Sequence, residues 1–236
     1  MRVSPYIAIN SSTPIQHKWS EAKGSEYLEV MDSKSRLFLA IEKALVPAQY
    51  AVGLAAAEWT LRRFEGHADV TDSLKRLEAA WAKAIDSSYG KPLKFRMSGS
   101  VFSAVPEVNG PLKIATFLIQ SLDTRLQERK RPIAETTTNQ VNLARHVVPD
   151  RKGFDAWVQQ VLVRAAQYFP NAGDSSLETD LPVLRELCDP DFDYTPEAVE
   201  KARKAFLASL DWKTNPYLNS PAEMKALGFT GTPYVD

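Results

Sequence analysis

Residues Ala48 to Phe64 read "AQYAVGLAAAEWTLRRF". This stretch is rich in alanine, contains Gly53, and is apolar most of the way around a helix drawn through it. A helix that is apolar on all sides is usually buried, and small side chains let neighbouring helices approach closely. We therefore expect this segment to be the central helix against which the others pack.

The chain before this segment is less regular. Pro47 interrupts a helical pattern that begins at Ser33, and an interior proline removes a hydrogen bond and clashes with the preceding turn. Residues 33–64 are therefore predicted to form two helices broken near Pro47. The first 25 residues show no helical period and are expected to be irregular, apart from a short strand over residues 6–9.

Apolar residues recur at helical spacing in several segments after the central one. Helices are predicted over residues 71–85, 111–131, 139–147, 153–169, 181–188, 196–210 and 221–227. Pro111 is taken as a helix start because the missing N–H of proline costs nothing at a first helical position. Short β-type runs around Ser98 and Gly99 allow one small hairpin within residues 93–105. The fold class is thus all-α, a multi-helix bundle of about eight helices.

The last segment carries clear helix-boundary signals. Ser220 and Glu223 match a capping box, and Gly228 is a suitable helix stop. Phe229 and Tyr234 in the tail are expected to dock back onto the body of the protein.

Composition narrows the class of protein. The chain has 236 residues, 44% of them hydrophobic, so one helical domain over residues 1–236 is expected; residues 131–138 are where two lobes would divide. Lys plus Arg and Asp plus Glu are both 29, and this zero balance argues against a dedicated nucleic-acid binder. The single cysteine, Cys188, excludes an internal disulfide and a thiolate metal cage.

The sequence gives no reason to expect a membrane location. The N-terminus lacks an apolar stretch long enough for a signal-peptide core. The longest weakly polar run, residues 44–59, is shorter than the roughly 20 residues that a membrane span needs. We therefore expect a cytoplasmic protein.

The stretch "DPDFDYTPEAVE", Asp189 to Glu200, has carboxylates at almost the spacing of a calcium-binding loop. Such a loop needs glycine at its sixth position, where this chain has Tyr194. A helix start explains the residues better, with Thr195 as N-cap and Pro196 at the first helical position. No metal site is predicted here.

Charge is unevenly distributed along the chain. Residues 174–200 contain nine acidic residues and one base, for a net charge of −8, whereas residues 91–131 have a net charge of +5. One interpretation is that the two segments are solvated faces, or that they pair with each other in the fold. The other is that the acidic segment binds a basic partner through complementary electrostatic potential. The last interpretation assigns partner binding to Asp189, Asp191, Asp193, Glu197 and Glu200.

Residues that could carry catalysis are few. The three histidines are far apart in sequence, no phosphate-binding glycine motif occurs, and no cofactor is predicted. His67 and Asp69 are expected to form a turn with a capping aspartate. Glu58 and Arg62, one helical turn apart, are expected to be a surface pair. The alternative is a partly buried pair that lines a cleft between helices.

Three functional hypotheses follow. The leading one is a non-enzymatic interaction protein, in its specific form a bacterial cognate-immunity or adaptor protein, whose acidic face binds a basic protein partner. The second is an enzyme of unrecognised type that uses Glu58 and Arg62, with His67 or His146 contributing. The third is a helical module with a cavity for a small apolar ligand beside the alanine-rich helix.

Overall fold

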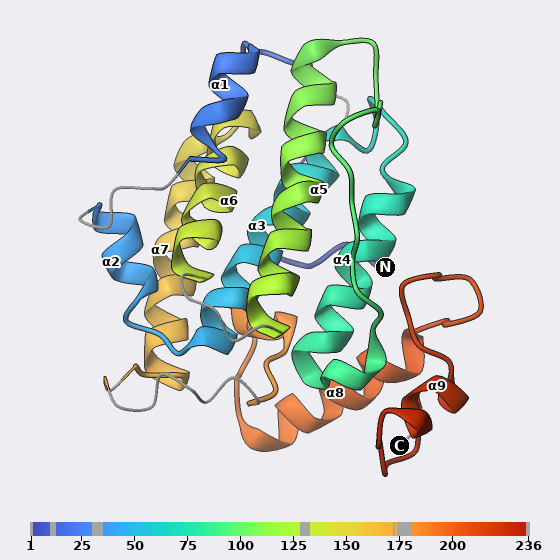
Figure 1. The fold of residues 1–236 in the computed structure, drawn as a ribbon. Helices are drawn as coiled ribbons and strands as arrows, with labels where there is room; N and C mark the ends of the chain where they lie inside the picture. Colours follow the sequence, from blue (N-terminus) through green and yellow to red (C-terminus); the bar gives the residue numbers. More distant parts are fainter. Residues whose placement is uncertain are drawn as a thin grey trace.

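A computed structural model describes residues 2–9, 13–29, 35–127, 133–171, 173 and 181–234. Over these residues the chain forms nine α-helices and two short 3-10 helices, and no sheet (Figure 1). The predicted all-α fold is confirmed. The elements are α1 (Glu21–Glu26), α2 (Arg36–Ile41), α3 (Val46–Phe64), α4 (Thr71–Ile85), η1 (Ser87–Tyr89), α5 (Pro106–Gln127), α6 (Ile133–Val147), α7 (Arg151–Tyr168), η2 (Arg185–Cys188), α8 (Pro196–Ser209) and α9 (Pro221–Ala226).

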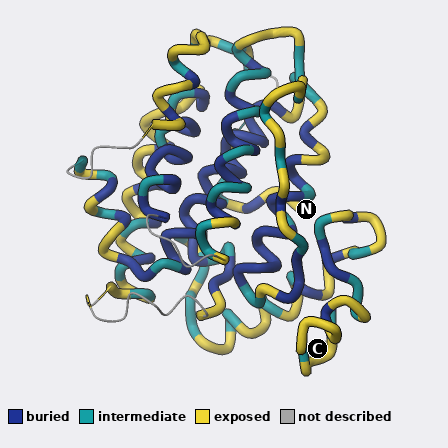
Figure 2. Tube along the Cα trace, viewed as in Figure 1, coloured by how far each residue is buried: buried dark blue, intermediate teal, exposed yellow. Residues whose placement is uncertain are grey.

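Helix α3 is the centre of the molecule, as the alanine-rich stretch predicts. Every residue from Pro47 to Phe64 is buried, and α3 packs against α4, α5, α6, α7 and η2. Figure 2 shows the inner helices as the buried part of the structure, with exposed residues on the outer helices and connections. The break near Pro47 is also confirmed, since α2 ends at Ile41 and α3 begins at Val46.

At Gly53, α5 and α6 both approach the backbone of α3 closely. A Cβ atom at this position would lie 2.7 Å from a Leu122 methyl carbon on α5 and 2.9 Å from the Thr137 hydroxyl on α6. The same hydroxyl donates a 2.9 Å hydrogen bond to the carbonyl oxygen of Gln49. The small residues of α3 therefore allow α5 and α6 to pack directly against its backbone.

Helix α5 begins five residues earlier than predicted, and Pro111 lies inside it. Because proline has no N–H, the carbonyl oxygen of Glu107 loses its usual donor four residues later. The His17 ring replaces this donor, with Nε2 2.8 Å from that oxygen. A side chain from the N-terminal segment thus compensates for the proline, and the helix continues through it.

The hairpin allowed within residues 93–105 does not form. The described residues there take part in no β-bridge, because their backbone amides bond to side chains of α5 instead of a second strand. Leu93 N donates to Asp123 at 3.4 Å, and Phe95 N donates to Gln120 at 2.6 Å. The segment is an extended strap across α4 and α5.

The N-terminal region differs in part from its prediction. Residues 21–25, expected to be irregular, belong to α1, and residues 6–9 form no strand. In the suggested division between lobes, residues 131 and 132 lie outside the described residues, and residues 133–138 form the first turns of α6. Domain organisation therefore stays a prediction.

The C-terminal segment folds back onto the body as expected. The capping box of Ser220 and Glu223 is present, and Gly228 follows α9 with a φ of +89°. Tyr234 is buried, contacts the edge of Tyr89, and its hydroxyl donates to the carbonyl oxygen of Asn219. None of the helices in the described parts of the chain is long and apolar enough to cross a membrane.

Candidate functional site

The acidic stretch at residues 189–200 is a loop followed by the start of α8. Thr195 is the N-cap, its hydroxyl accepting from Ala198 N, and Pro196 occupies the first helical position. The predicted helix start is thereby confirmed. Asp189 stabilises the loop itself, since its carboxylate accepts a 3.1 Å hydrogen bond from Asp191 N.

The five predicted partner-binding residues are not equivalent. Asp189 is half-buried, and Glu200 forms ion pairs with Arg203 at 2.8 Å and Lys204 at 3.8 Å. Hydrogen bonding to Arg203 lowers the pKa of Glu200. The remaining three are exposed, and their carboxylates have no hydrogen-bond or ion-pair partner within the described chain. These three, Asp191, Asp193 and Glu197, are called the acidic surface below.

Arg164 of α7 holds the loop that carries two of these carboxylates. Its guanidinium donates to the carbonyl oxygens of Leu187, Pro190 and Phe192 at 3.2, 3.4 and 2.8 Å. Three bonds from one planar group fix the path of the chain over six residues. Asp191 and Asp193 are therefore presented from a loop whose backbone is tied to a long helix.

Aromatic packing supports the same loop. Tyr194 contacts the rings of Tyr168 and Phe192, with centroid distances of 4.9 and 6.1 Å. Beneath it, the Trp157 indole donates a 2.9 Å hydrogen bond to the carbonyl oxygen of Cys188. The role of Arg164 was not predicted from the sequence. The available signal was its position seven residues after Trp157, within the apolar stripe of α7.

Glu58 and Arg62 are buried, so the predicted surface pair is wrong. Glu58 is 0% exposed and Arg62 5% exposed. The Glu58 carboxylate accepts from Ser4 N at 3.1 Å, the Ser4 hydroxyl at 2.6 Å and the Tyr6 hydroxyl at 3.4 Å, and lies 3.7 Å from Arg62 Nε. Glu58 thus anchors the N-terminal segment to the central helix.

A pocket of about 400 Å³ lies between this N-terminal segment and the loop at residues 189–195. Ser4 and Tyr6 line one side, and Glu186, Asp189 and Phe192 line the other. One predicted partner-binding residue, Asp189, lines this pocket directly. Glu58, the predicted catalytic candidate, holds two residues of its wall, Ser4 and Tyr6, in place. Arg2 and Arg185 also line the pocket, which balances its charge.

The acidic and basic segments do not pair with each other in the described structure. None of the ion pairs between described residues joins residues 174–200 to residues 91–131. Lys91 instead pairs with Glu223, and Asp123 with Lys83. The acids at 174, 178 and 180 and the charged residues 128–131 lie outside the described residues.

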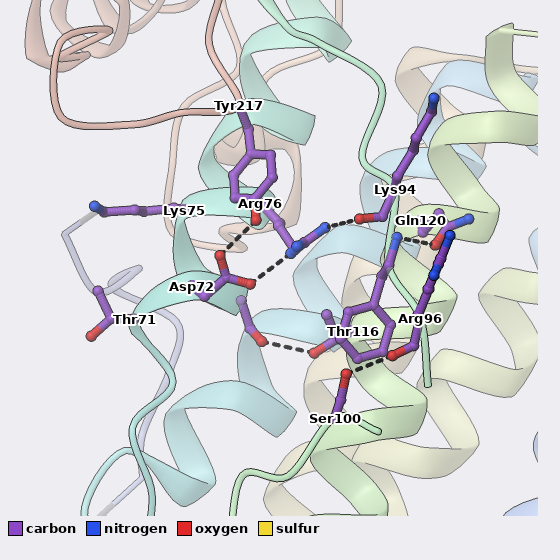
Figure 3. Close-up of polar contacts among 12 residues, drawn as sticks. Thr71, Asp72, Lys75, Arg76, Lys94, Arg96, Ser100, Thr116, Gln120 and Tyr217 are labelled. Atoms are coloured by element: carbon purple, nitrogen blue, oxygen red, sulfur yellow. Dashed lines mark hydrogen bonds and ion pairs between the residues drawn. The ribbon is translucent and has the colours of Figure 1, made fainter. Parts of the chain in front are cut away.

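Arg76 of α4 contacts both the C-terminal segment and the backbone of the strap (Figure 3). The Arg76 guanidinium donates to Asp72 and to the carbonyl oxygen of Lys94, both at 2.8 Å, and lies 4.3 Å from the Tyr217 ring centre. The Tyr217 hydroxyl donates to Asp72 at 2.6 Å. These contacts join the strap and the C-terminal segment to α4. The contacts of the Arg76 guanidinium are therefore explained by structural roles within the protein, and no ligand is needed to explain them.

The histidines and the cysteine also have structural partners. His67 lies 3.4 Å from Arg63 Nη1, and Asp69 accepts from Thr71 N in the turn before α4, whose N-cap is Val70 and not Asp69 as predicted. His146 Nε2 lies 3.1 Å from the carbonyl oxygen of Lys18. Cys188 is fully buried, and burial raises the pKa of its thiol. No group of three or more His, Cys, Asp or Glu among the described residues could hold a metal ion.

Comparison with known proteins gives no relative. No protein-family model, curated protein sequence or solved structure matches the chain. The arguments about function therefore depend on the residues and their geometry alone.

Proposed function

We propose that this protein is a non-enzymatic interaction protein that binds a basic protein partner through Asp191, Asp193 and Glu197. The observation that carries the proposal is that these three exposed carboxylates have no partner among the described residues and stand on a loop and helix start that Arg164 holds in place. Nearby basic groups would normally neutralise such carboxylates, as Arg203 does for Glu200.

Physical chemistry favours a basic partner for such a surface. Several like charges at fixed positions produce a local potential that accelerates encounter with an oppositely charged protein. A loop already held in its bound conformation loses little conformational freedom on binding, so more of the interaction energy appears as affinity. In its specific form, the proposal is an adaptor or cognate-immunity protein that covers a basic surface of its partner.

No observation favours the catalytic alternative to the same degree. The Glu58 carboxylate already accepts three hydrogen bonds from the N-terminal segment and faces Arg62, so its oxygens are engaged in structural contacts. A general base has to reach a substrate proton within hydrogen-bond distance. Ser4 and Tyr6, which donate to Glu58, are among the residues that line the neighbouring pocket, and Glu58 is not.

The test is a pull-down from the native host at low and moderate salt, with captured proteins identified by mass spectrometry. Three baits are compared: the wild type, the triple variant D191N/D193N/E197Q, and a control variant E21Q/E29Q/E42Q. The control removes three exposed carboxylates that also lack side-chain partners in the described chain but lie on or beside α1 and α2.

The proposal expects one stoichiometric basic protein that the wild type and the control capture at low salt. The triple variant should lose it, and moderate salt should weaken its capture. A partner that all three baits retain equally at both salt concentrations would contradict the proposal.

A further inference from the structure

A second pocket lies on a different part of the molecule, between α1 and the N-terminal half of α5. Its volume is about 530 Å³, within the range of about 300–1,000 Å³ typical of small-molecule sites. Figure 1 shows α1 beside the end of α5 at which residues 97–106 arrive. Apolar side chains that line it include Trp19 and Leu28, which flank α1, Met97 of the strap and Ile114 of α5.

The Trp19 wall of this pocket is preformed. The indole lies against the backbone of α5 at Gly110, where an added Cβ atom would overlap the ring. A Cβ atom on Gly24 of α1 would lie 3.3 Å from the same ring, and Tyr27 stacks on it at a centroid distance of 5.9 Å. Neighbours on several sides therefore fix the indole, and a ligand would meet a rigid aromatic surface.

Two hydrogen-bond donors of α5 face this apolar space. Lys113 lines the pocket and is half-buried, yet its ammonium has no hydrogen-bond or ion-pair partner within the described chain. Asn109 precedes it by four residues, so both lie on one face of the helix. The side-chain oxygen Oδ1 of Asn109 accepts from Phe102 N at 2.9 Å, which leaves its NH₂ group available as a donor.

This combination defines the chemistry of a ligand. A half-buried ammonium loses part of its hydration, and a carboxylate that reaches both Lys113 and Asn109 would restore the lost interactions. The aromatic and aliphatic walls would bury an apolar body. Glu21 also lines the pocket but is exposed and forms no ion pair with Lys113, so it opposes an anion only from the solvent side.

We propose that the pocket between α1 and α5 binds a small amphipathic carboxylate, with its carboxylate at Lys113 and Asn109 and its apolar body against Trp19. This site is independent of the acidic surface and does not depend on the proposed partner. Octanoate is a suitable probe of this class. A ligand of this size is expected to bind with a Kd on the order of 0.1–1 mM.

Tryptophan fluorescence reports binding. Trp59, Trp81 and Trp157 are buried, whereas Trp19 and Trp212 are partly exposed. The wild type and W19F are titrated with octanoate, octan-1-ol and octylamine, and the signal absent in W19F is assigned to the pocket. The wild type should bind octanoate at least tenfold more tightly than either of the other two probes.

Variants separate recognition of the carboxylate from apolar binding. K113M should weaken octanoate binding about tenfold or more and leave octan-1-ol binding unchanged. K94M removes an exposed lysine of the strap and serves as the matched control, with wild-type affinity. E21Q should bind octanoate at least as tightly as the wild type, because it removes a negative charge near the ligand.

A104W provides a second, independent test, because residue 104 is exposed and lines the pocket, so a large side chain there should fill the pocket without disturbing the core. Circular dichroism confirms that each variant is folded. Binding of octanoate that K113M weakens and A104W abolishes supports the proposal. The proposal would be overturned if the wild type bound octanoate and octan-1-ol with equal affinity, if K113M bound octanoate as tightly as the wild type, or if the wild type did not bind octanoate.

Discussion

Arg164 on α7 donates a 2.8 Å hydrogen bond to the carbonyl oxygen of Phe192, which lies between Asp191 and Asp193. The same guanidinium also bonds to the carbonyl oxygens of Leu187 and Pro190. A positive charge thus determines the shape of a negatively charged loop through its backbone. Arg164 sets the position of the loop, whereas the aspartates supply its negative charge. The two contributions to partner binding can therefore be tested with different variants.

Replacing Arg164 by methionine should weaken partner binding even though it makes the region more acidic. The three carbonyl groups lose their common donor, so the loop no longer holds Asp191 and Asp193 in place. Free energy of unfolding should fall by about 1–3 kcal/mol in urea denaturation. Calorimetric titration with the partner would show reduced affinity. Tighter binding by the variant would mean that charge alone matters.

Removing the bases beside Glu200 should have the opposite effect on binding. In the variant R203A/K204A, Glu200 loses the ion pairs that now neutralise it and joins the acidic surface. Because exposed pairs contribute only about 0–1 kcal/mol, stability should change little. Affinity for a basic partner should rise a few-fold at low salt, and the gain should disappear at high salt. Unchanged affinity would place Glu200 outside the interface.

The buried pair of Lys83 and Asp123 should be essential to the stability of the packing between α4 and α5. Their side chains are 2% exposed and 2.5 Å apart, and burial lowers the pKa of Lys83 and raises that of Asp123. K83M alone should cost about 3–5 kcal/mol of unfolding free energy, because it leaves a buried carboxylate unpaired.

The double variant K83M/D123L should be more stable than K83M, since it removes both charges from the interior. Chemical denaturation of the wild type, the two single variants and the double variant gives the coupling energy. Costs that simply add in the double variant would show that the two charges do not depend on each other.

Stability should fall as pH is lowered, because of His17 and His146. Burial lowers the pKa of both rings below the usual value of 6.5. The unfolded chain then binds protons at a higher pH than the folded one, so the contribution is complete above about pH 6.5. This contribution to the free energy of unfolding decreases as pH falls below the histidine pKa of the unfolded chain. It stops decreasing below the pKa values of the folded protein.

The variant H17Q/H146Q tests this pH dependence, because glutamine can keep an N–H donor without titrating in this range. Urea denaturation between pH 5 and pH 8 should show a smaller decrease in stability for the variant than for the wild type. Identical pH profiles would mean that other groups are responsible.

The features that could be predicted from the sequence are those with local causes. The central helix follows from the composition of residues 48–64, its boundary from Pro47, and the start of α8 from Thr195 and Pro196. Each of these depends on residues within a few positions of one another, so period and capping rules apply directly.

The errors have causes that are distant in sequence. Helix α5 continues through Pro111 because His17, more than 90 residues away, supplies the missing donor. The strap does not form a hairpin because Asp123 and Gln120 accept from its amides. Glu58 is buried because the N-terminal segment bonds to it. Such partners become visible only once the chain is folded, and the same holds for the role of Arg164.

The salt dependence of partner affinity tests the central claim most directly. Calorimetric titrations of the captured partner with the wild type, D191N/D193N/E197Q and E21Q/E29Q/E42Q would be made over a series of salt concentrations. Wild-type and control affinities should fall steeply with salt, while the triple variant should bind weakly and with a shallow salt dependence. A triple variant with wild-type affinity and the same salt dependence would contradict the central claim.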